Sequence, residues 1–184
     1  MDIDPTKPLA AFGFLTVLES AEHGLFGGYL VLSTQGRPLE FRCTTPVKAS
    51  RAQEILYGPT LRPYLLAEMI GKALVDGAET PVRVILTDQR EMLPLAALHR
   101  EEVLCVEPRE TGRDDAGTCE YGGSAITAFT GGPRSIEALA ATLGELASHI
   151  DLDEPFGRVR AALVEAQLAL PDAAEVDDER AAAA

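Results

Sequence analysis

Residues 11–44 read AFGFLTVLESAEHGLFGGYLVLSTQGRPLEFRCT, and this stretch decides the fold class. Its apolar and aromatic runs at 11–18, 25–34 and 38–44 are typical of strands, because such side chains fit a pleated, half-buried surface. The links between the runs are short, and the second link, QGR, contains a glycine that can adopt a positive φ in a tight hairpin. The stretch therefore predicts three consecutive antiparallel strands.

Two details of this stretch predict how the strands pack. In the third run Leu39, Phe41 and Cys43 alternate with charged residues, which predicts that these three side chains are buried. Gly27-Gly28 lies inside the second run and has the spacing of neither phosphate-binding glycine motif. We interpret this pair as a bulge or as the close approach of another backbone.

Helical patterns begin after Pro46. Ser50-x-x-Gln53 has the form of a capping box, and Thr60 can cap a longer amphipathic helix that ends at Gly77. Further apolar runs predict strands at residues 81–87, 102–106 and 124–129, with a short helical piece near residues 94–98. Residues 107–122 read as one long irregular stretch, either a mobile loop or a β-turn excursion.

Two further helical patterns fill residues 133–170, with apolar positions recurring at i, i+3, i+4 and i+7. They predict an antiparallel αα-hairpin. The whole order of elements indicates an α+β fold, a mostly antiparallel sheet with helices on one face and this C-terminal αα-hairpin.

The same pattern divides the chain into four parts. We expect a flexible lead-in (1–8), an α+β domain (9–132), the αα-hairpin packed on or extending that domain (133–170), and an acidic, alanine-rich frayed tail (171–184).

Charge and composition restrict the partners. The 184 residues include 16 basic and 29 acidic ones, which gives a formal net charge of −13. Such a field repels a polyanion, so the sequence predicts no nucleic-acid partner. No apolar run approaches the roughly 20 residues that span a bilayer, so we expect no membrane association.

The cysteines and histidines point to a reducing compartment without a metal. Three cysteines at long spacings do not form a disulfide framework, and the start of the chain lacks the features of a secretory signal. We therefore predict a cytoplasmic protein. The three histidines lie far apart, with no second ligand at helical spacing, so no metal site or cofactor is expected.

The segment 51–64 is the strongest candidate binding site. It gathers arginines and tyrosines, which are enriched at interface hot spots, around a Gly-Pro break, and its second helix could receive an anion at its N-terminus. The alternative is a structural corner whose arginines bridge acids on neighbouring elements. The candidate binding residues are Arg51, Tyr57, Thr60, Arg62 and Tyr64.

Asp88 is the candidate catalytic carboxylate, because it directly follows an apolar strand. Asp88-x-x-Glu91 also has the form of a capping box, which would account for both acids without chemistry. No lysine or histidine at a suitable spacing completes a catalytic set.

These observations together favour a non-catalytic cytoplasmic domain for protein interaction or regulation, making contacts through segment 51–64 and the αα-hairpin. Its expected partner is another protein or a second copy of the chain, with a small anion as a further candidate. The alternative is a small enzyme or anion-binding domain that uses Asp88 together with Arg51 or Arg62.

Overall fold

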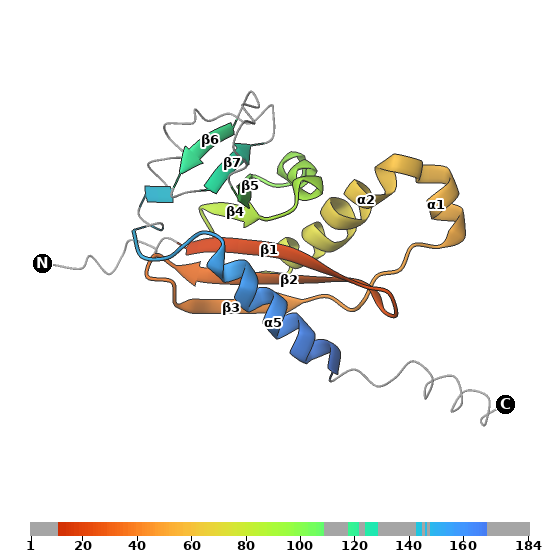
Figure 1. Ribbon diagram of the computed structural model, residues 1–184, viewed down its shortest axis with the longest axis horizontal. Coiled ribbons are helices and arrows are strands. Elements are labelled where there is room, and N and C mark those ends of the chain that lie inside the picture. The colour runs from red at the N-terminus through yellow and green to blue at the C-terminus, as the bar shows by residue number, and fades with distance from the viewer. Residues whose placement is uncertain are drawn as a thin grey trace, which may run out of the picture.

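The structure is a computed structural model that describes residues 11–108, 118–121, 124–128, 143–144, 146 and 148–168. Within these residues a seven-stranded sheet runs in the order β3-β2-β1-β4-β5-β7-β6 (Figure 1). Its strands are β1 (Ala11–Ser20), β2 (Gly24–Ser33), β3 (Pro38–Cys43), β4 (Val84–Thr87), β5 (Glu102–Pro108), β6 (Thr118–Tyr121) and β7 (Ser124–Ala128).

The predicted three-strand meander is confirmed. β1 pairs antiparallel with β2, and β2 pairs antiparallel with β3. Gly24, the first residue of β2, and Gly36, in the turn before β3, have φ of 87° and 72°, a region that L side chains rarely adopt. The positive φ that the sequence predicts for the glycine of the second link is confirmed at Gly36.

The predicted burial of β3 is wrong. β3 lies at the edge of the sheet, where Leu39 and Phe41 are 46% and 41% exposed and Cys43 is also exposed. The charged face is the covered one, because Glu40 accepts hydrogen bonds from the backbone N–H groups of Glu79 and Thr80 (3.1 and 2.8 Å). Alternation alone does not reveal which face of an edge strand its neighbours cover.

The centre of the sheet is parallel. β1 pairs with β4 and β4 pairs with β5 in parallel, whereas β5–β7 and β7–β6 are antiparallel. The mixed α+β class is therefore present, and the antiparallel description fits both flanks but not the middle. Three parallel strands end at the same edge, which we call the carboxyl edge.

Helices cover both faces of the sheet, so the prediction of helices on one face is wrong. α5 (Glu154–Leu168) packs on one face through Phe156, Val159 and Leu163, where Phe14 and Leu86 also contribute to the core. The other helices of the described residues are α1 (Arg51–Tyr57), η1 (Gly58–Thr60), α2 (Leu61–Pro63), η2 (Tyr64–Gly71), α3 (Lys72–Asp76) and η3 (Arg90–Ala97).

The second core lies between the opposite face of the sheet and η2, α3 and η3. Its fully buried side chains include Leu15, Ile85, Leu66, Ile70 and Met92. The sheet is thus buried on both sides, which is typical of parallel strands and accounts for their continuous apolar runs.

Gly27 and Gly28 admit one helix from each side. A Cβ atom on Gly27 would lie 2.2 Å from Ile70 Cγ2, and one on Gly28 would lie 2.5 Å from Val159 Cγ1. Both distances are shorter than van der Waals contact, so side chains of the covering helices fill the space beside these glycines, and the predicted approach of another backbone is not what the structure shows.

The helical segment keeps one predicted cap and loses another. Ser50 Oγ accepts the N–H of Gln53, and the Gln53 side chain accepts the N–H of Ser50, which confirms the capping box. Thr60 makes no capping bond; its hydroxyl donates to Tyr57 O instead. α1 ends at its C-cap Gly58, whose φ of 51° is not helical, and the next helical segment, η1, begins there, so Thr60 lies inside that segment and not at its start.

The last predicted elements are only partly described. α5 is the expected second helix of the αα-hairpin, whereas most of the first helix lies outside the described residues, as do residues 1–8 and 171–184. Strand β6 lies within the stretch predicted to be irregular. Among the described helices, none has the length and apolar character needed to cross a membrane.

Candidate functional site at the carboxyl edge of the sheet

Asp88 follows β4 at the carboxyl edge and points to the α5 face of the sheet. Its Oδ2 forms an ion pair with Nη2 of Arg160 on α5, and its side chain is 12% exposed. The Oδ1 atom is buried and has no hydrogen-bond partner among the described residues. This edge therefore holds a nearly buried carboxylate with one oxygen unused.

Asp88 is not a helix cap. The residue before η3 is Gln89, which makes no side-chain capping bond. Instead Gln89 Nε2 donates to Val17 O (3.0 Å) and Gln89 Oε1 accepts the N–H of Val17 (3.2 Å). These bonds fasten the end of β4 to β1, so the capping-box interpretation of Asp88 and Glu91 is wrong.

Thr16 stands beside Asp88 on the neighbouring strand. Leu15 and Thr87 are the last pair of the β1–β4 ladder, and Thr16 and Asp88 are the residues that directly follow this pair. Alternation from Phe14 and Leu86 places both on the α5 face. Thr16 is fully buried, and its hydroxyl has no hydrogen-bond partner among the described residues.

The opposite face of the carboxyl edge carries a neutralised pair. Arg90 donates to both oxygens of Glu107, at 2.7–2.8 Å from Nε, and Nη2 lies 2.6 Å from Oε2. Cys105, two residues before Glu107, is buried, and burial first, then the charge of Glu107, raises the pKa of its thiol to about 12. This thiol is therefore protonated and is no nucleophile at neutral pH.

The candidate residues of segment 51–64 are spread along a helical corner. Arg51 Nη1 pairs with Glu54 (2.8 Å), and the rings of Tyr57 and Tyr64 contact each other with centroids 4.6 Å apart. Thr60 is committed to its local backbone bond. These contacts have the form of the structural corner, and a binding role for this segment stays a prediction.

Arg62 is the exception, because it joins three elements. Its Nη1 contacts Glu19 at the end of β1 (2.8 Å) and its Nε contacts Glu91 in η3 (3.3 Å). The hydrogen bond to Glu19 raises the pKa of Arg62, with smaller contributions from the charges of both glutamates, against a lowering by burial.

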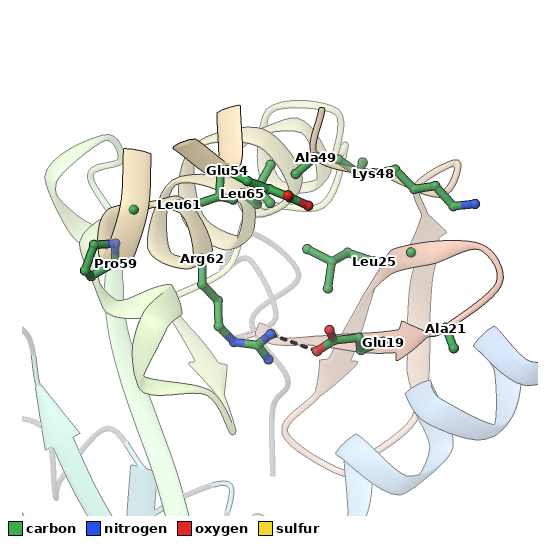
Figure 2. Close-up of a pocket in the computed structure, with 13 residues that line it drawn as sticks. Glu19, Ala21, Leu25, Lys48, Ala49, Glu54, Pro59, Leu61, Arg62 and Leu65 are labelled. Carbon is green, nitrogen blue, oxygen red and sulfur yellow. Dashed lines mark hydrogen bonds and ion pairs between the residues drawn. The ribbon is translucent and has the colours of Figure 1, made fainter. Parts of the chain in front are cut away.

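A pocket of about 530 Å³ opens beside Arg62, between the β1–β2 turn and the helical corner. Figure 2 shows Arg62 and Glu19 joined on one side of the pocket, with Lys48 on the other side and Leu25 between them. Of the five candidate binding residues, Arg62 alone lines it.

The structure separates the residues of the alternative enzyme site. Arg51 pairs with Glu54 and Arg62 with Glu19 and Glu91, whereas Asp88 pairs with Arg160. An anion site built from Asp88 with Arg51 or Arg62 is therefore wrong. Sequence reasoning missed Arg160, because the apolar spacing of α5 does not indicate which strand end the helix crosses. Gly28 was the available signal, since it marks where a helix approaches closely.

The described part of the chain holds no cluster of the usual metal-binding side chains. No group of three or more histidine, cysteine, aspartate or glutamate side chains within it could hold a metal ion. At the carboxyl edge a guanidinium already occupies one oxygen of Asp88.

Comparison with known proteins finds solved structures that share this fold. No family model matches the chain, and neither does any curated protein. The chain is similar to a crystal structure of the catalytic domain of human endonuclease V, with 16% identity, a TM-score of 0.56, and coverage of 89% of this chain and 85% of that one. A second structure of the human enzyme gives 15% identity, a TM-score of 0.53, and coverage of 88% and 86%.

This likeness corrects two functional predictions. The non-catalytic protein-interaction domain is contradicted, because the fold is that of a nuclease catalytic domain. The exclusion of nucleic acid is wrong on the same finding. That exclusion rested on the net charge of the whole chain, whereas a bound nucleic-acid strand contacts only one local part of the protein surface.

Proposed function

We propose that the chain is a nucleic-acid-processing protein. It holds a nucleic-acid strand across the carboxyl edge at Asp88 and acts on the phosphodiester backbone of that nucleic acid. The observation that carries the proposal is the buried, unused Oδ1 of Asp88, at the end of a central parallel strand, in a fold that a nuclease catalytic domain shares.

The position of Asp88 supports a ligand site. In open sheets with parallel strands, ligands bind outside the carboxyl ends of those strands. β1, β4 and β5 all end at this edge, and Gln89 holds two of the ends together. A group placed there is therefore held by rigid elements, as a catalytic group must be.

The chemistry of the pair suits a phosphodiester. A guanidinium matches phosphate oxygens in a planar, bidentate manner, and it would stabilise the negative charge that grows on those oxygens in the transition state. A carboxylate oxygen without a partner can accept a proton from a water molecule as the water oxygen bonds to phosphorus; the bond from phosphorus to the leaving sugar oxygen breaks, and that oxygen takes a proton from solvent. We assign the first role to Arg160 and the second to Oδ1 of Asp88.

Many nucleases hold two divalent ions between carboxylates. The described residues do not fit such an ion, because Asp88 is a single carboxylate whose Oδ2 faces Arg160 and whose neighbour, Thr16, offers an uncharged hydroxyl. The proposed reaction therefore uses only Asp88, Arg160 and water at this edge.

The first experiment measures strand binding and cleavage together. Fluorescently labelled single- and double-stranded DNA and RNA are titrated by anisotropy at low ionic strength, and the same mixtures are resolved on gels. Arg160→Ala should weaken binding to every sequence and reduce the salt slope by about one unit, as the loss of one phosphate contact does. Arg158→Ala is the matched control, because Arg158 lies on the same helix but pairs with Glu154.

Asp88→Asn separates the two halves of the proposal. It removes a negative charge beside the strand, so binding should hold or tighten, while cleavage falls by about 10²–10⁴-fold. Strand binding without cleavage by the wild type would overturn the proposed reaction. No binding, or equal losses for Arg160→Ala and Arg158→Ala, would overturn the site itself.

A reducing, cytoplasmic compartment stays a prediction from the cysteines.

A further inference from the structure

The positive charge beside Asp88 is the side chain of Arg160, which belongs to the protein itself. Arg160 reaches Asp88 from α5, 72 positions along the chain, and the Arg160 side chain is 45% exposed whereas the Asp88 side chain is 12% exposed. The carboxylate is therefore the fixed, inner member of the pair, and the arginine approaches it from the solvent side.

Packing of α5 fixes where Arg160 stands. Val159, directly before it, and Leu163, one turn later, lie 2.5 and 3.1 Å from where a Cβ atom on Gly28 would be. One turn earlier, Phe156 contacts Phe14 edge to face, with ring centroids 5.5 Å apart. Three apolar contacts thus hold this part of α5 on the sheet, so the guanidinium is placed by the core.

A divalent ion at the same point would need different neighbours. Magnesium and manganese prefer several oxygen ligands, usually with more than one carboxylate. At this edge the described ligands on the α5 face are the Asp88 carboxylate and the Thr16 hydroxyl, and a fixed positive charge lies against them. Asp88 and Arg160 together sum to zero charge, which leaves nothing to attract a second cation.

We infer that Arg160 is the resident cation of the carboxyl edge and stands where a divalent ion would bind to Asp88. The wild-type edge therefore binds no divalent ion, and replacing Arg160 by an acid creates a site for one. The inference rests on the same edge as the proposed function but does not require nucleic acid.

The experiment uses Mn²⁺ alone as the probe. Binding to the full chain is read from the electron paramagnetic resonance signal of free Mn²⁺, and thermal unfolding is followed in MnCl₂ and in NaCl of equal ionic strength. Arg160→Asp should bind Mn²⁺ with a Kd of about 10⁻³ M or tighter and should melt higher in MnCl₂. Adding Asp88→Asn to that variant should abolish both effects. Wild type and Asp88→Asn should be indistinguishable.

Arg158→Asp is the matched control, because it adds the same charge to α5 two residues away. If Arg160→Asp does not unfold cooperatively, Arg160→Ala replaces it as the test variant. Arg160→Ala should bind Mn²⁺ more weakly than the value expected for Arg160→Asp, but still through Asp88. Asp88-dependent binding of Mn²⁺ by the wild type overturns the inference. Equal binding by Arg160→Asp and Arg158→Asp does so too. A failure of strand binding would leave these results untouched, so the two proposals are tested separately.

Discussion

Glu40 on β3 lies on the covered face of the strand. The alternating pattern predicted that this charged face is exposed. Glu40 belongs to the charged side of β3, yet it is the covered side chain, because its carboxylate accepts backbone N–H groups of Glu79 and Thr80 and pairs with Arg42 (3.5 Å). Burial alone would raise the pKa of Glu40, but these donors outweigh burial and lower it. The carboxylate therefore stabilises the fold only while it is ionised.

Glu40→Gln should lower the free energy of unfolding by about 1 kcal/mol near neutral pH, because charge-assisted bonds become ordinary ones. The lowered pKa means that this contribution is complete above the unfolded-state pKa of about 4.3 and is lost as pH falls through the lower folded-state pKa. Urea unfolding of both proteins from neutral to acidic pH measures the difference, which should shrink toward zero. Glu22→Gln, in the exposed β1–β2 turn, is the control. A difference that grows on acidification contradicts the assignment.

At the scale of elements, the close approach of α5 depends on Gly28. Two glycines at this contact have opposite surroundings. Gly28, on β2 beneath the helix, leaves no room for a Cβ atom, whereas Gly157, within α5, has no atom within 4 Å of where its Cβ would lie. The two positions therefore give a matched pair of substitutions with opposite expected signs.

Gly28→Ala should destabilise the protein by about 1–3 kcal/mol, because the added methyl group overpacks the contact with Val159. Gly157→Ala should stabilise it by up to about 1 kcal/mol, the gain of alanine over glycine in a helix interior. Chemical denaturation with an unchanged m-value measures both. A neutral Gly28→Ala variant would show that α5 can lift away from the sheet without cost.

Local signals predicted elements well and their surroundings poorly. The capping box at Ser50 and the positive φ of Gly36 are confirmed because both are decided within four residues. The predicted burial of β3 is wrong because neighbours distant in sequence decide it, whereas the predicted cap at Thr60 is wrong because the helical segment begins earlier, at Gly58, and the hydroxyl bonds Tyr57 O. The site follows the same rule: Asp88 was recognisable from the strand before it, whereas Arg160 was not, since its partner lies 72 positions away.

At the scale of the molecule, the parallel centre explains why helices cover both faces. A chain that starts as an antiparallel meander and then adds β4 and β5 beside β1 has apolar side chains on both sides of its central strands, and the two cores follow. The sequence order alone predicted an antiparallel sheet, because short links dominate its first 44 residues.

The same scale sets the response to salt. With 29 acidic and 16 basic residues, the folded chain concentrates like charges that the unfolded chain spreads apart. NaCl that shortens the Debye length from about 30 Å to about 8 Å should therefore raise the melting midpoint by a few degrees, since about 1 kcal/mol moves it by about 2–4 °C in a chain of this size. Scanning calorimetry measures the midpoint, and a fall over this range contradicts the prediction.

The place of β1 in the sheet also has a consequence for how the protein is made. On the ribosome, β2 and β3 emerge soon after β1 and can pair along one of its sides at once. The other side waits for β4, because Phe12 pairs with Val84, 72 positions later. Until that segment has left the exit tunnel, the nascent chain presents an unpaired strand edge with apolar faces, the surface on which chains most readily aggregate. Folding of the central strand is therefore completed only after β4 has been synthesised, although β2 and β3 are available much earlier.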